Sequence, residues 1–338
     1  MAHNGAAPGA DLVVVGDCNP DILVAGGDVT PEFGQREKLV EQISLVIGGS
    51  AAITAVAAAR LGLRVALVAA VGDDPVGRFL LGQLTAEGVD VSVMAVRPGF
   101  PTGATVALSR GQDRAILTAT GAMTLLTAAD VPVALLAGAK HLHVGSYFLV
   151  ERSLGPGLAE LFARARAAGV TTSLDTNWDP SERWGGDQLG GILAQTDVLM
   201  PNEAEALRIS GAGTLAEAVA VLTAAGARLA VKCGADGALC VDGAGGAQHT
   251  VVLPPVEAVD TTGAGDCFNA GMITGLLRGL DLPRAAALGC AVAAASTRAL
   301  GGTGAALDLA AAMIAAAAAS IARLPEPGGL GKARHLFR

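Results

Sequence analysis

The stretch that decides the fold is DTTGAGDCFNAG at residues 260–271. Gly263 and Gly265 flank the small Ala264, and a run that is typical of a first helical turn follows. Glycines at this density allow another group to approach the backbone closely, and the unpaired amides at a helix N-terminus bind anions. The pattern therefore predicts an anion-binding turn between a strand and a helix, with the amides of Gly263, Ala264 and Gly265 as donors.

Asp266 stands in the first turn of this predicted helix, where a carboxylate is placed to take a proton from a substrate hydroxyl. Amide donors for developing negative charge and a base for the acceptor hydroxyl are two parts of a phosphoryl-transfer site. The alternative is that Asp266 only caps the helix and the glycines only turn the chain. The occurrence of both features within one short stretch favours phosphoryl transfer.

Short β-rich apolar runs alternate along the chain with longer helical segments. We expect strands to begin near residues 12, 64, 140, 170, 197 and 228, and helices at 50–61, 75–87, 153–168, 202–209, 214–225, 264–278, 283–298 and 307–322. This order is typical of a parallel sheet with helices on both faces. The predicted fold class is therefore α/β.

Two segments break this alternation. Residues 21–47 and 102–118 alternate apolar and polar residues around turns, which indicates half-exposed antiparallel strands that form a small second sheet. No linker or repeat divides the chain, so we expect one main domain over residues 11–322 that carries this sheet. Residues 1–10 are expected to be a disordered N-terminal tail, and residues 323–338 a flexible C-terminal tail.

Composition excludes several classes of protein. The net charge is −8 and the aromatic residues are seven Phe, two Trp and one Tyr, so the chain is not expected to bind nucleic acid. Its five scattered cysteines are expected to be reduced and mostly buried. No apolar stretch reaches the roughly 20 residues that a membrane span needs, and no secretory signal precedes the first strand. We therefore expect a cytoplasmic protein that does not enter a membrane.

The stretch at 260–271 resembles the carboxyl-terminal signature of the ribokinase-like (PfkB) family of carbohydrate kinases. Further motifs follow in the family's order: GDCNPD at 16, GGSAAITAVAAARLG at 48, VGDDPVGR at 71, PNEAEA at 201, KCGADGA at 232 and LGGTGA at 300. The resemblance extends from about residue 11 to about residue 310. It implies a three-layer α/β/α ribokinase-like fold with a mainly parallel central sheet and a small β-sheet lid.

The resemblance also implies which residues hold the acceptor. Asp21 corresponds to an aspartate that holds sugar hydroxyls, and Gly48 and Gly49 to a glycine pair that lets the sugar approach the backbone. Arg114, in the second lid segment, has two interpretations. It is either an exposed strand end or a guanidinium that contacts a carboxylate or phosphate of the substrate.

Other positions correspond to the family's metal sites. Asn202 and Glu205 correspond to residues that act near Mg²⁺ and the phosphates, with water between the ion and the protein. Asp260 and Thr262 resemble residues near a loop that binds a monovalent cation, so K⁺ is a further expected cofactor. The alternative for Glu205 is a solvated charge on a helix.

The nucleotide is expected along the turn KCGADGA. The resemblance places Gly234 and Gly237 in the turn that lines the nucleotide, together with Gly265 of the anion-binding turn. Lys232 is interpreted either as a charge at a strand end or as a nucleotide contact. The implied phosphoryl donor is ATP, used with Mg²⁺.

One position departs from the family pattern. Where ribokinases have an asparagine that hydrogen-bonds the sugar, this chain has Ile53, which should change the set of sugars that fit. The resemblance therefore implies ATP-dependent phosphorylation of a hydroxyl, primary in our expectation, on a small sugar or sugar-like substrate. The alternatives are a nucleoside kinase of the same fold and a catalytically silent sugar sensor. Family members are often dimers through the lid, so we expect a homodimer.

Two further patterns are interpreted as structural. GAGTLA at 211–216 matches a dinucleotide-binding fingerprint, but it follows a predicted helix end rather than a strand, which favours a loop. His141 and His143 share one face of a predicted strand, and no third ligand is evident, so packing within the sheet is favoured over a metal site.

Overall fold

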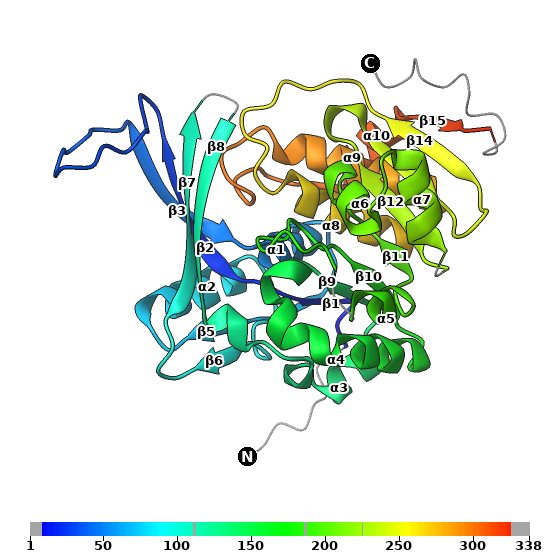
Figure 1. The fold of residues 1–338 in the computed structure, drawn as a ribbon, viewed down its shortest axis with the longest axis horizontal. Helices are drawn as coiled ribbons and strands as arrows, with labels where there is room; N and C mark the ends of the chain where they lie inside the picture. Colours follow the sequence, from blue (N-terminus) through cyan, green and yellow to red (C-terminus); the bar gives the residue numbers. More distant parts are fainter. Residues whose placement is uncertain (1–8, 111–112, 186–187, 225, 326–338) are drawn as a thin grey trace.

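The computed structural model describes residues 9–110, 113–185, 188–224 and 226–325. A nine-stranded sheet crosses the molecule in the order β15-β14-β13-β12-β11-β10-β9-β1-β4 (Figure 1). These strands are β1 (Leu12–Val15), β4 (Val65–Val68), β9 (His141–Val144), β10 (Thr171–Leu174), β11 (Val198–Leu199), β12 (Arg228–Lys232), β13 (Ala238–Val241), β14 (Gln248–Val252) and β15 (Ser320–Arg323). The six from β12 to β4 pair in parallel, which confirms the predicted mainly parallel sheet.

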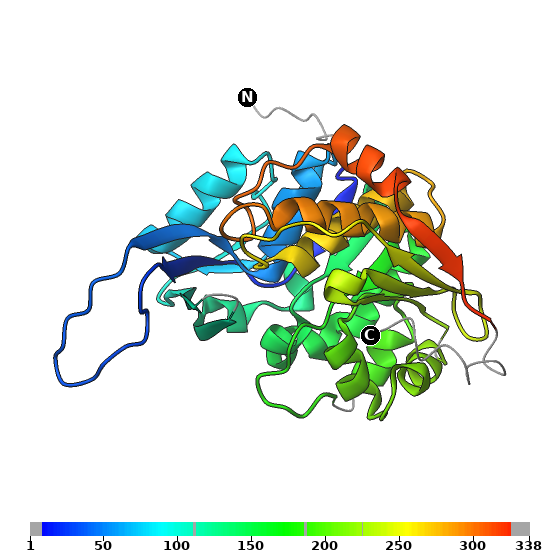
Figure 2. The same cartoon turned by 90° about the horizontal axis from the view of Figure 1, so that it is seen from above.

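Helices cover both faces of this sheet, as Figure 2 shows from above. One hydrophobic cluster joins the sheet to α1 (Ser50–Arg60), α2 (Pro75–Ala86), α8 (Ala264–Leu277), α9 (Leu282–Ser296) and α10 (Leu309–Ala317). A second cluster joins the opposite face to α3 (Val133–Ala137), α4 (Tyr147–Ala167), α5 (Leu189–Leu193), α6 (Glu203–Ser210) and α7 (Leu215–Thr223). The three-layer α/β/α architecture is therefore confirmed.

A four-stranded sheet, the lid, stands off one side of the molecule (Figure 1). Its strands, in the order β3-β2-β7-β8, are β2 (Asn19–Ala25), β3 (Gln42–Gly48), β7 (Thr102–Arg110) and β8 (Asp113–Gly121). The two outer pairs are antiparallel, as the alternating pattern predicts, but β2 and β7 in the middle are parallel. Each predicted segment thus supplies one pair of lid strands, and the pairs join at β2 and β7.

Several elements differ from the sequence-based expectation. The strand expected from residue 64 is divided into β4 and β5 (Ala70–Gly72), and β5 pairs with β6 (Ala95–Arg97) in a separate sheet. Strands β13 to β15 were not predicted. The helix predicted at 307–322 was wrong at its end, because α10 stops at Ala317 and β15 follows. The strand forms by antiparallel pairing with β14, a non-local contact that an alanine-rich sequence does not indicate.

The two predicted tails fall largely outside the described residues. Residues 1–8 and 326–338 lie outside them. Ala10 packs against the second hydrophobic cluster, and Arg323 pairs with His249 in the sheet. Among the described residues no single helix is long and apolar enough to cross a membrane, and only α6 and α7 counted together across a 64° bend pass that test.

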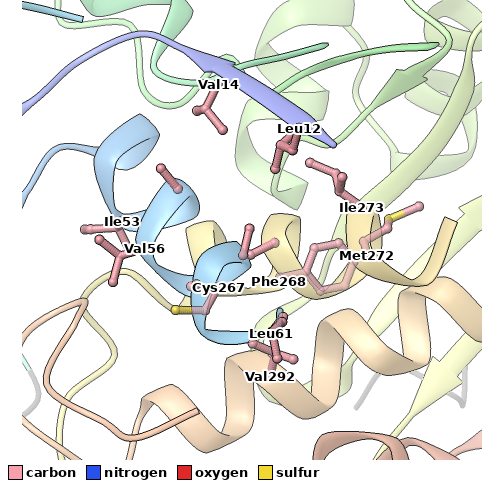
Figure 3. Packing of buried hydrophobic residues seen from close by; sticks show 14 of the residues in the cluster. Leu12, Val14, Ile53, Val56, Leu61, Cys267, Phe268, Met272, Ile273 and Val292 are labelled. Carbon is pink, nitrogen blue, oxygen red and sulfur yellow. The ribbon is translucent and has the colours of Figure 1, made fainter. Parts of the chain in front are cut away.

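Helices α8 and α9 pack with their backbones in close contact. A Cβ on Gly271 of α8 would lie 2.8 Å from the carbonyl oxygen of Leu288, and one on Gly275 would lie 2.8 Å from the Cα of Ala285. Figure 3 shows the adjoining packing of α1, α8 and α9 through Val56, Leu61, Phe268, Met272 and Val292. The helix that follows the DTTGAGD turn is therefore fixed by neighbours on two sides.

Candidate active site

Polar side chains gather where the parallel strands end. The carboxyl ends of parallel strands lie at one edge of a sheet, and ligands bind at this edge in open α/β folds. Residues that follow β1, β9, β10, β11 and β12 are Asp17, Ser146, Asp175, Asn202 and Cys233, and the last residue of β12 is Lys232. Helix α8 begins beside this edge.

The DTTGAGD turn leads into α8 as predicted, but the expectation of a strand directly before it was wrong, because β14 ends at Val252 and no strand lies between it and α8 in this described part of the chain. Gly263 is the N-cap residue with φ 72°, a left-handed conformation that favours glycine, and no side chain caps the helix. The Ala264 amide donates to the Thr261 carbonyl at 3.2 Å, so this member of the predicted anion hole already has a partner. Within the described part of the chain the Gly265 amide has none, which leaves it available for an anion.

Asp266 lies in the first turn of α8 and is only 6% exposed. Among the described residues no backbone amide of this turn is found to donate to the Asp266 carboxyl, so the alternative that it merely caps the helix is not supported. Burial raises the pKa of the Asp266 carboxyl well above its usual range, and nearby Asp175 adds to the rise while Lys232 opposes it. A carboxylate of raised pKa is a stronger base near neutral pH than an ordinary aspartate.

Lys232 and Asp175 form an ion pair at the centre of the site. Asn269 of α8 also donates to Asp175, through Nδ2, so three elements meet at this carboxylate. A Cβ on Gly265 would lie 3.5 Å from Nζ of Lys232, which places the ammonium beside the anion-binding turn. Burial alone would lower the pKa of Lys232, but Asp175 and Glu205 outweigh it and raise the pKa, so the side chain stays charged.

Asn202 and Glu205 form a reciprocal capping box at the start of α6. The Glu205 carboxylate accepts from the Asn202 amide at 2.8 Å and from Nδ2 of Asn202 at 2.7 Å. Burial raises the pKa of Glu205 to about 7, with Asp175 as the second cause. Glu205 is buried while Glu203 is exposed, so the interpretation of Glu205 as a solvated helix charge was wrong.

The turn that follows Lys232 has the shape expected of a glycine turn. Gly234 has φ 58° and Gly237 has φ 89°. The Cys233 amide donates to the Gly237 carbonyl at 2.8 Å and closes the turn. Lys232 itself is held against the PNEAEA motif, because its amide donates to the carbonyl of Pro201 at 2.9 Å. The two predicted nucleotide motifs are therefore neighbours.

The predicted acceptor residues meet at the base of the lid. A Cβ on Gly48 would lie 2.0 Å from Oδ1 of Asp21, so only glycine fits under this carboxylate. Asn19 donates from Nδ2 to Oδ1 of Asp21 at 3.0 Å and orients it. Gly49 has φ 87° and leads directly into α1. The structure thus brings Asp21 and both glycines together.

Ile53, which replaces the asparagine of ribokinases, packs against the backbone of the DTTGAGD turn. It is 3% exposed, and its side chain lies beside the backbone of Gly263 and Gly302, since a Cβ on Gly302 would lie 2.5 Å from Cδ1 of Ile53. An isoleucine here therefore supports the turn by apolar contact, where an asparagine would offer a polar group.

Asp260 ties the DTTGAGD turn to the LGGTGA loop. Its Oδ1 accepts from the amide and hydroxyl of Thr262, at 2.9 and 2.7 Å, and its Oδ2 accepts from the Gly301 amide at 2.8 Å. The backbone of Arg114 lies opposite Ser109 in the outer hairpin of the lid, but its side chain lies outside the described residues. Its predicted contact with the substrate stays a prediction.

The sequence interpretation missed Asp175, Asp17 and Asn177. Asp17 and Asp175 each come soon after a predicted strand. This position could have indicated that they belong to the site, since the carboxyl ends of parallel strands lie together at one edge of the sheet. Their partners could not be read from the sequence, because Lys232 lies 57 residues after Asp175.

The two patterns interpreted as structural behave as expected. His141 Nε2 and His143 Nδ1 both bond to the hydroxyl of Ser173, at 2.7 and 2.8 Å, so the two rings share one face inside the sheet. GAGTLA lies between two helices, since Gly211 ends α6 and Thr214 caps α7. All five cysteines are free, and four are buried.

Comparison with known proteins defines the class. The model of the pfkB family carbohydrate kinases matches residues 10–308. The chain is 30% identical to the ribokinase of Bacillus subtilis over 279 residues, which cover 81% of this chain and 88% of that protein. It is 35% identical to a fructokinase of Klebsiella pneumoniae over 244 residues, which cover 68% of this chain and 76% of that protein.

A solved structure agrees with this match. An Escherichia coli protein described as a ribokinase II, crystallised with ATP and Mg²⁺, has a TM-score of 0.79 and 26% identity, and the match covers 90% of this chain and 98% of that one. Fold and site together define a phosphotransferase. The chain belongs to the pfkB family of carbohydrate kinases.

Proposed function

We propose that the protein transfers the γ-phosphoryl group of ATP to a hydroxyl of a small sugar or sugar-like substrate, with Asp266 as general base. The observation that carries this assignment is a buried carboxylate of raised pKa beside the free amide of Gly265. The ATP complex of the E. coli relative supports the choice of donor. Asp21, Gly48 and Gly49 would orient the acceptor, and Arg114 is a further candidate contact from the lid.

The proposed reaction is a direct transfer of the phosphoryl group from ATP to the acceptor. The acceptor hydroxyl loses its proton to the Asp266 carboxylate while its oxygen forms a bond to the γ-phosphorus. The bond from that phosphorus to the bridging oxygen breaks, and its electron pair leaves with ADP. Negative charge that develops on the transferred group is stabilised by the amides of Gly263 and Gly265 and by the ammonium of Lys232. The lid would exclude water, which otherwise competes as acceptor.

The donor set of the site fits Mg²⁺. The carboxylates near the charged Lys232 are those of Asp175, Glu205 and Asp266. Carboxylate oxygens are ligands that Mg²⁺ prefers. Both Glu205 oxygens already accept from Asn202, so Asn202 and Glu205 would hold the ion through water. When bound, Mg²⁺ neutralises charge on the β- and γ-phosphates.

We further propose that the loop of Asp260 and Thr262 responds to a monovalent cation such as K⁺. Asp260 joins this loop to Gly301, so an ion bound there would stiffen the start of α8. Activity in KCl against choline chloride at equal ionic strength measures this effect. A cytoplasmic location is proposed on the five free cysteines.

A homodimer through the lid is proposed because the lid carries exposed apolar side chains. Phe33, Leu39 and Ile43 are 99%, 86% and 66% exposed. The loop between β2 and β3 extends away from the body (Figure 2). Side chains of this kind on a protruding sheet mark an interaction surface.

A nucleoside is the second candidate acceptor. Trp178, which follows Asn177 at the site edge, is 49% exposed and packs edge-on against Trp184 with ring centroids 4.5 Å apart. An exposed, rigidly held indole offers a stacking face for a base. The relatives include a cytidine kinase of Thermococcus kodakarensis, which is 29% identical.

The test is ADP release with ATP and Mg²⁺ across a panel of ribose, fructose, 2-keto-3-deoxygluconate, fructose phosphates, adenosine and cytidine. Selective turnover of a sugar supports the proposal, and turnover of a nucleoside alone supports the second candidate. With the best acceptor, Asp266→Asn should keep nucleotide affinity and lose kcat by at least about a hundredfold. Unchanged kcat in this variant would contradict the role of Asp266, and ATP binding without any ADP release would indicate the silent sensor.

A further inference from the structure

The proposed chemistry does not use the VGDDPVGR motif at residues 71–78. In the structure this motif runs from the end of β5 into α2, and β7 of the lid begins beside it at Thr102. Asp74 is the N-cap residue of α2 and accepts from the Gly77 amide at 2.7 Å. Its carboxylate also bonds to Thr102, so one side chain joins the body of the molecule to the lid.

Three hydrogen bonds hold the buried Thr102 in this place. Its amide donates to Oδ2 of Asp74 at 2.7 Å, and its hydroxyl donates to Oδ1 of Asp74 at the same distance. Oγ1 of Thr102 in turn accepts from the Gly72 amide at 2.9 Å. A hydroxyl has one proton and two lone pairs, so it can bridge an amide and a carboxylate in this way. The two bonds to the carboxylate are of the stronger, charge-assisted kind.

The two glycines of the motif allow the chain to approach Thr102 closely. A Cβ on Gly72 would lie 2.2 Å from the carbonyl oxygen of Phe100 and 2.7 Å from the amide nitrogen of Thr102. A Cβ on Gly77 would lie 2.3 Å from the carbonyl oxygen of Gly72 and 2.9 Å from Oγ1 of Thr102. Both glycines and Asp74 therefore meet at the first residue of β7, which accounts for their spacing in the motif.

Strand β7 reaches the proposed acceptor residues three positions after Thr102. Thr105 on β7 lies opposite Asp21 on β2 in the parallel pair of the lid, about 10 Å along the strand from Thr102. Nδ2 of the buried Asn19 donates to Oγ1 of Thr105 and to Oδ1 of Asp21, each at 3.0 Å. A shift of β7 would therefore also move the carboxylate that is proposed to hold the acceptor.

We propose that Asp74 is a positioning residue for acceptor binding, which acts by holding the start of β7 through Thr102. The proposal rests on the proposed role of Asp21 in orienting the acceptor. Strand β8 is the edge strand of the lid and pairs with β7, so the contact at Thr102 holds both strands of the outer hairpin. Without this contact the hairpin can shift relative to α2, and the groups that bind the acceptor lose their fixed geometry.

Asp74→Asn separates this role from the capping of α2. An asparagine oxygen still accepts from the Gly77 amide, since asparagine caps helices about as well as aspartate does. The NH₂ group of asparagine only donates and would face the Thr102 amide, which is also a donor. In the full-length protein, KM for the best acceptor should rise roughly tenfold, the effect of one lost hydrogen bond to a charged group. KM for ATP should stay within about twofold of the wild-type value.

Deuterium exchange measures the contact between Asp74 and Thr102 without any acceptor. Amide hydrogens of β7 and β8 should exchange roughly tenfold faster in Asp74→Asn than in the wild type, whereas those of α8 should be unchanged. Thr102→Val keeps the shape of the side chain and loses both hydroxyl bonds, so it should change exchange and the acceptor KM in the same direction. Thr102→Ser keeps the hydroxyl and should return both quantities toward the wild-type values.

Two controls use carboxylates outside this contact. Asp73 precedes Asp74 in the motif, but its side chain is 62% exposed and pairs with Arg78 at 3.3 Å, so Asp73→Asn should match the wild type. Asp281 caps α9 and accepts from the Arg284 amide at 3.0 Å. Asp281→Ala removes this cap, so it should lower the thermal midpoint and leave both KM values unchanged.

The outcomes distinguish this proposal from the proposed acceptor site. If Asp21→Asn raises KM for the acceptor while Asp74→Asn does not, the positioning role is wrong and the acceptor site stands. Equal rises of both KM values in Asp74→Asn, or a lowered thermal midpoint with both KM values unchanged, also overturn the positioning role, because they reflect distortion or folding alone. If β7 and β8 exchange faster in Asp74→Asn but neither variant changes KM for the acceptor, the acceptor role of Asp21 is wrong, and the positioning role that rests on it fails as well.

Discussion

Lys232 and Asp175, 57 residues apart in the sequence, form an ion pair at the centre of the site. The Asp175 side chain is 1% exposed and the Lys232 side chain 13% exposed, so the pair is shielded from water. It joins β12 to β10, and through Asn269 it also joins the sheet to α8. The ammonium that is proposed to bind phosphate and the helix that carries the proposed base are therefore joined through Asp175.

Lys232→Met should destabilise the protein, because it leaves the buried Asp175 carboxylate without its cation. Loss of one partner of a buried pair costs roughly 3–5 kcal/mol in the free energy of unfolding, measured by urea denaturation. Lys140→Met is the matched control, since Lys140 pairs with Asp11 at the surface, is 62% exposed, and should cost about 1 kcal/mol or less. Equal losses in the two variants would contradict the central role of the pair.

Gly48→Ala should weaken acceptor binding and leave ATP binding unchanged. The added methyl group would lie 2.0 Å from Oδ1 of Asp21, so that carboxylate must move. We expect KM for the acceptor to rise roughly tenfold, the effect of one lost charged hydrogen bond, with KM for ATP unchanged. Gly82→Ala in α2 is the control, because, apart from the adjoining backbone of α2, no atom of the described residues lies within 4 Å of the added methyl group. A rise in both KM values would indicate general distortion instead.

His143 should make the protein less stable as the pH falls. Burial lowers its pKa from 6.5 to about 4, while Asp175 opposes and Lys232 supports this shift. Between about pH 6.5 and pH 5 the unfolded chain gains a proton that the folded protein does not, so this contribution to stability falls by about 2 kcal/mol.

The comparison with His143→Gln isolates this effect, because glutamine keeps a polar contact for Ser173 and does not titrate. Urea denaturation of both proteins at about pH 7.5 and about pH 5 gives the difference in their free energies of unfolding. The advantage of the wild type should shrink by about 2 kcal/mol at the lower pH. An advantage that stays constant with pH would mean that His143 does not remain neutral in the folded protein.

Ile43→Glu should give a monomer if the lid forms a dimer interface. Ile43 is 66% exposed on β3, and a buried charge in an apolar contact is costly. Light scattering coupled to size exclusion measures the mass. Ile314→Glu is the control, because Ile314 is 76% exposed on α10, away from the lid, and should leave the mass unchanged. A wild-type protein that is already monomeric at high concentration would refute the dimer.

The parts of the site that are formed by residues close together in the sequence could be predicted from local patterns. The DTTGAGD turn and the Asn202–Glu205 motif are contained in a few residues, so their spacing alone places them at helix starts. The alternation of strand and helix patterns along the chain likewise predicted a parallel sheet with helices on both faces, because each pattern is contained in a short segment. These features are confirmed in the structure.

Contacts between distant segments were not predictable from one sequence. Ser50 and Asn177, whose side chains are hydrogen-bonded, are 127 residues apart, and nothing in either segment indicates the other. Strand β15 forms only because β14 offers an edge, and β13 and β14 likewise depend on antiparallel partners. The burial that raises the pKa of Asp266 is also a property of the assembled layers.

The close contact between α8 and α9 should make the local stability of α8 much higher than that of the lid. Gly271 and Gly275 bring the two helices together so tightly that the amides of α8 open only when much of the fold opens. The lid has far fewer buried side chains and carries Phe33 and Leu39 in water. Amide hydrogens of α8 should therefore exchange with deuterium slowest and those of the β2–β3 hairpin fastest, so we expect the helix that carries the proposed base to stay fixed while the lid moves.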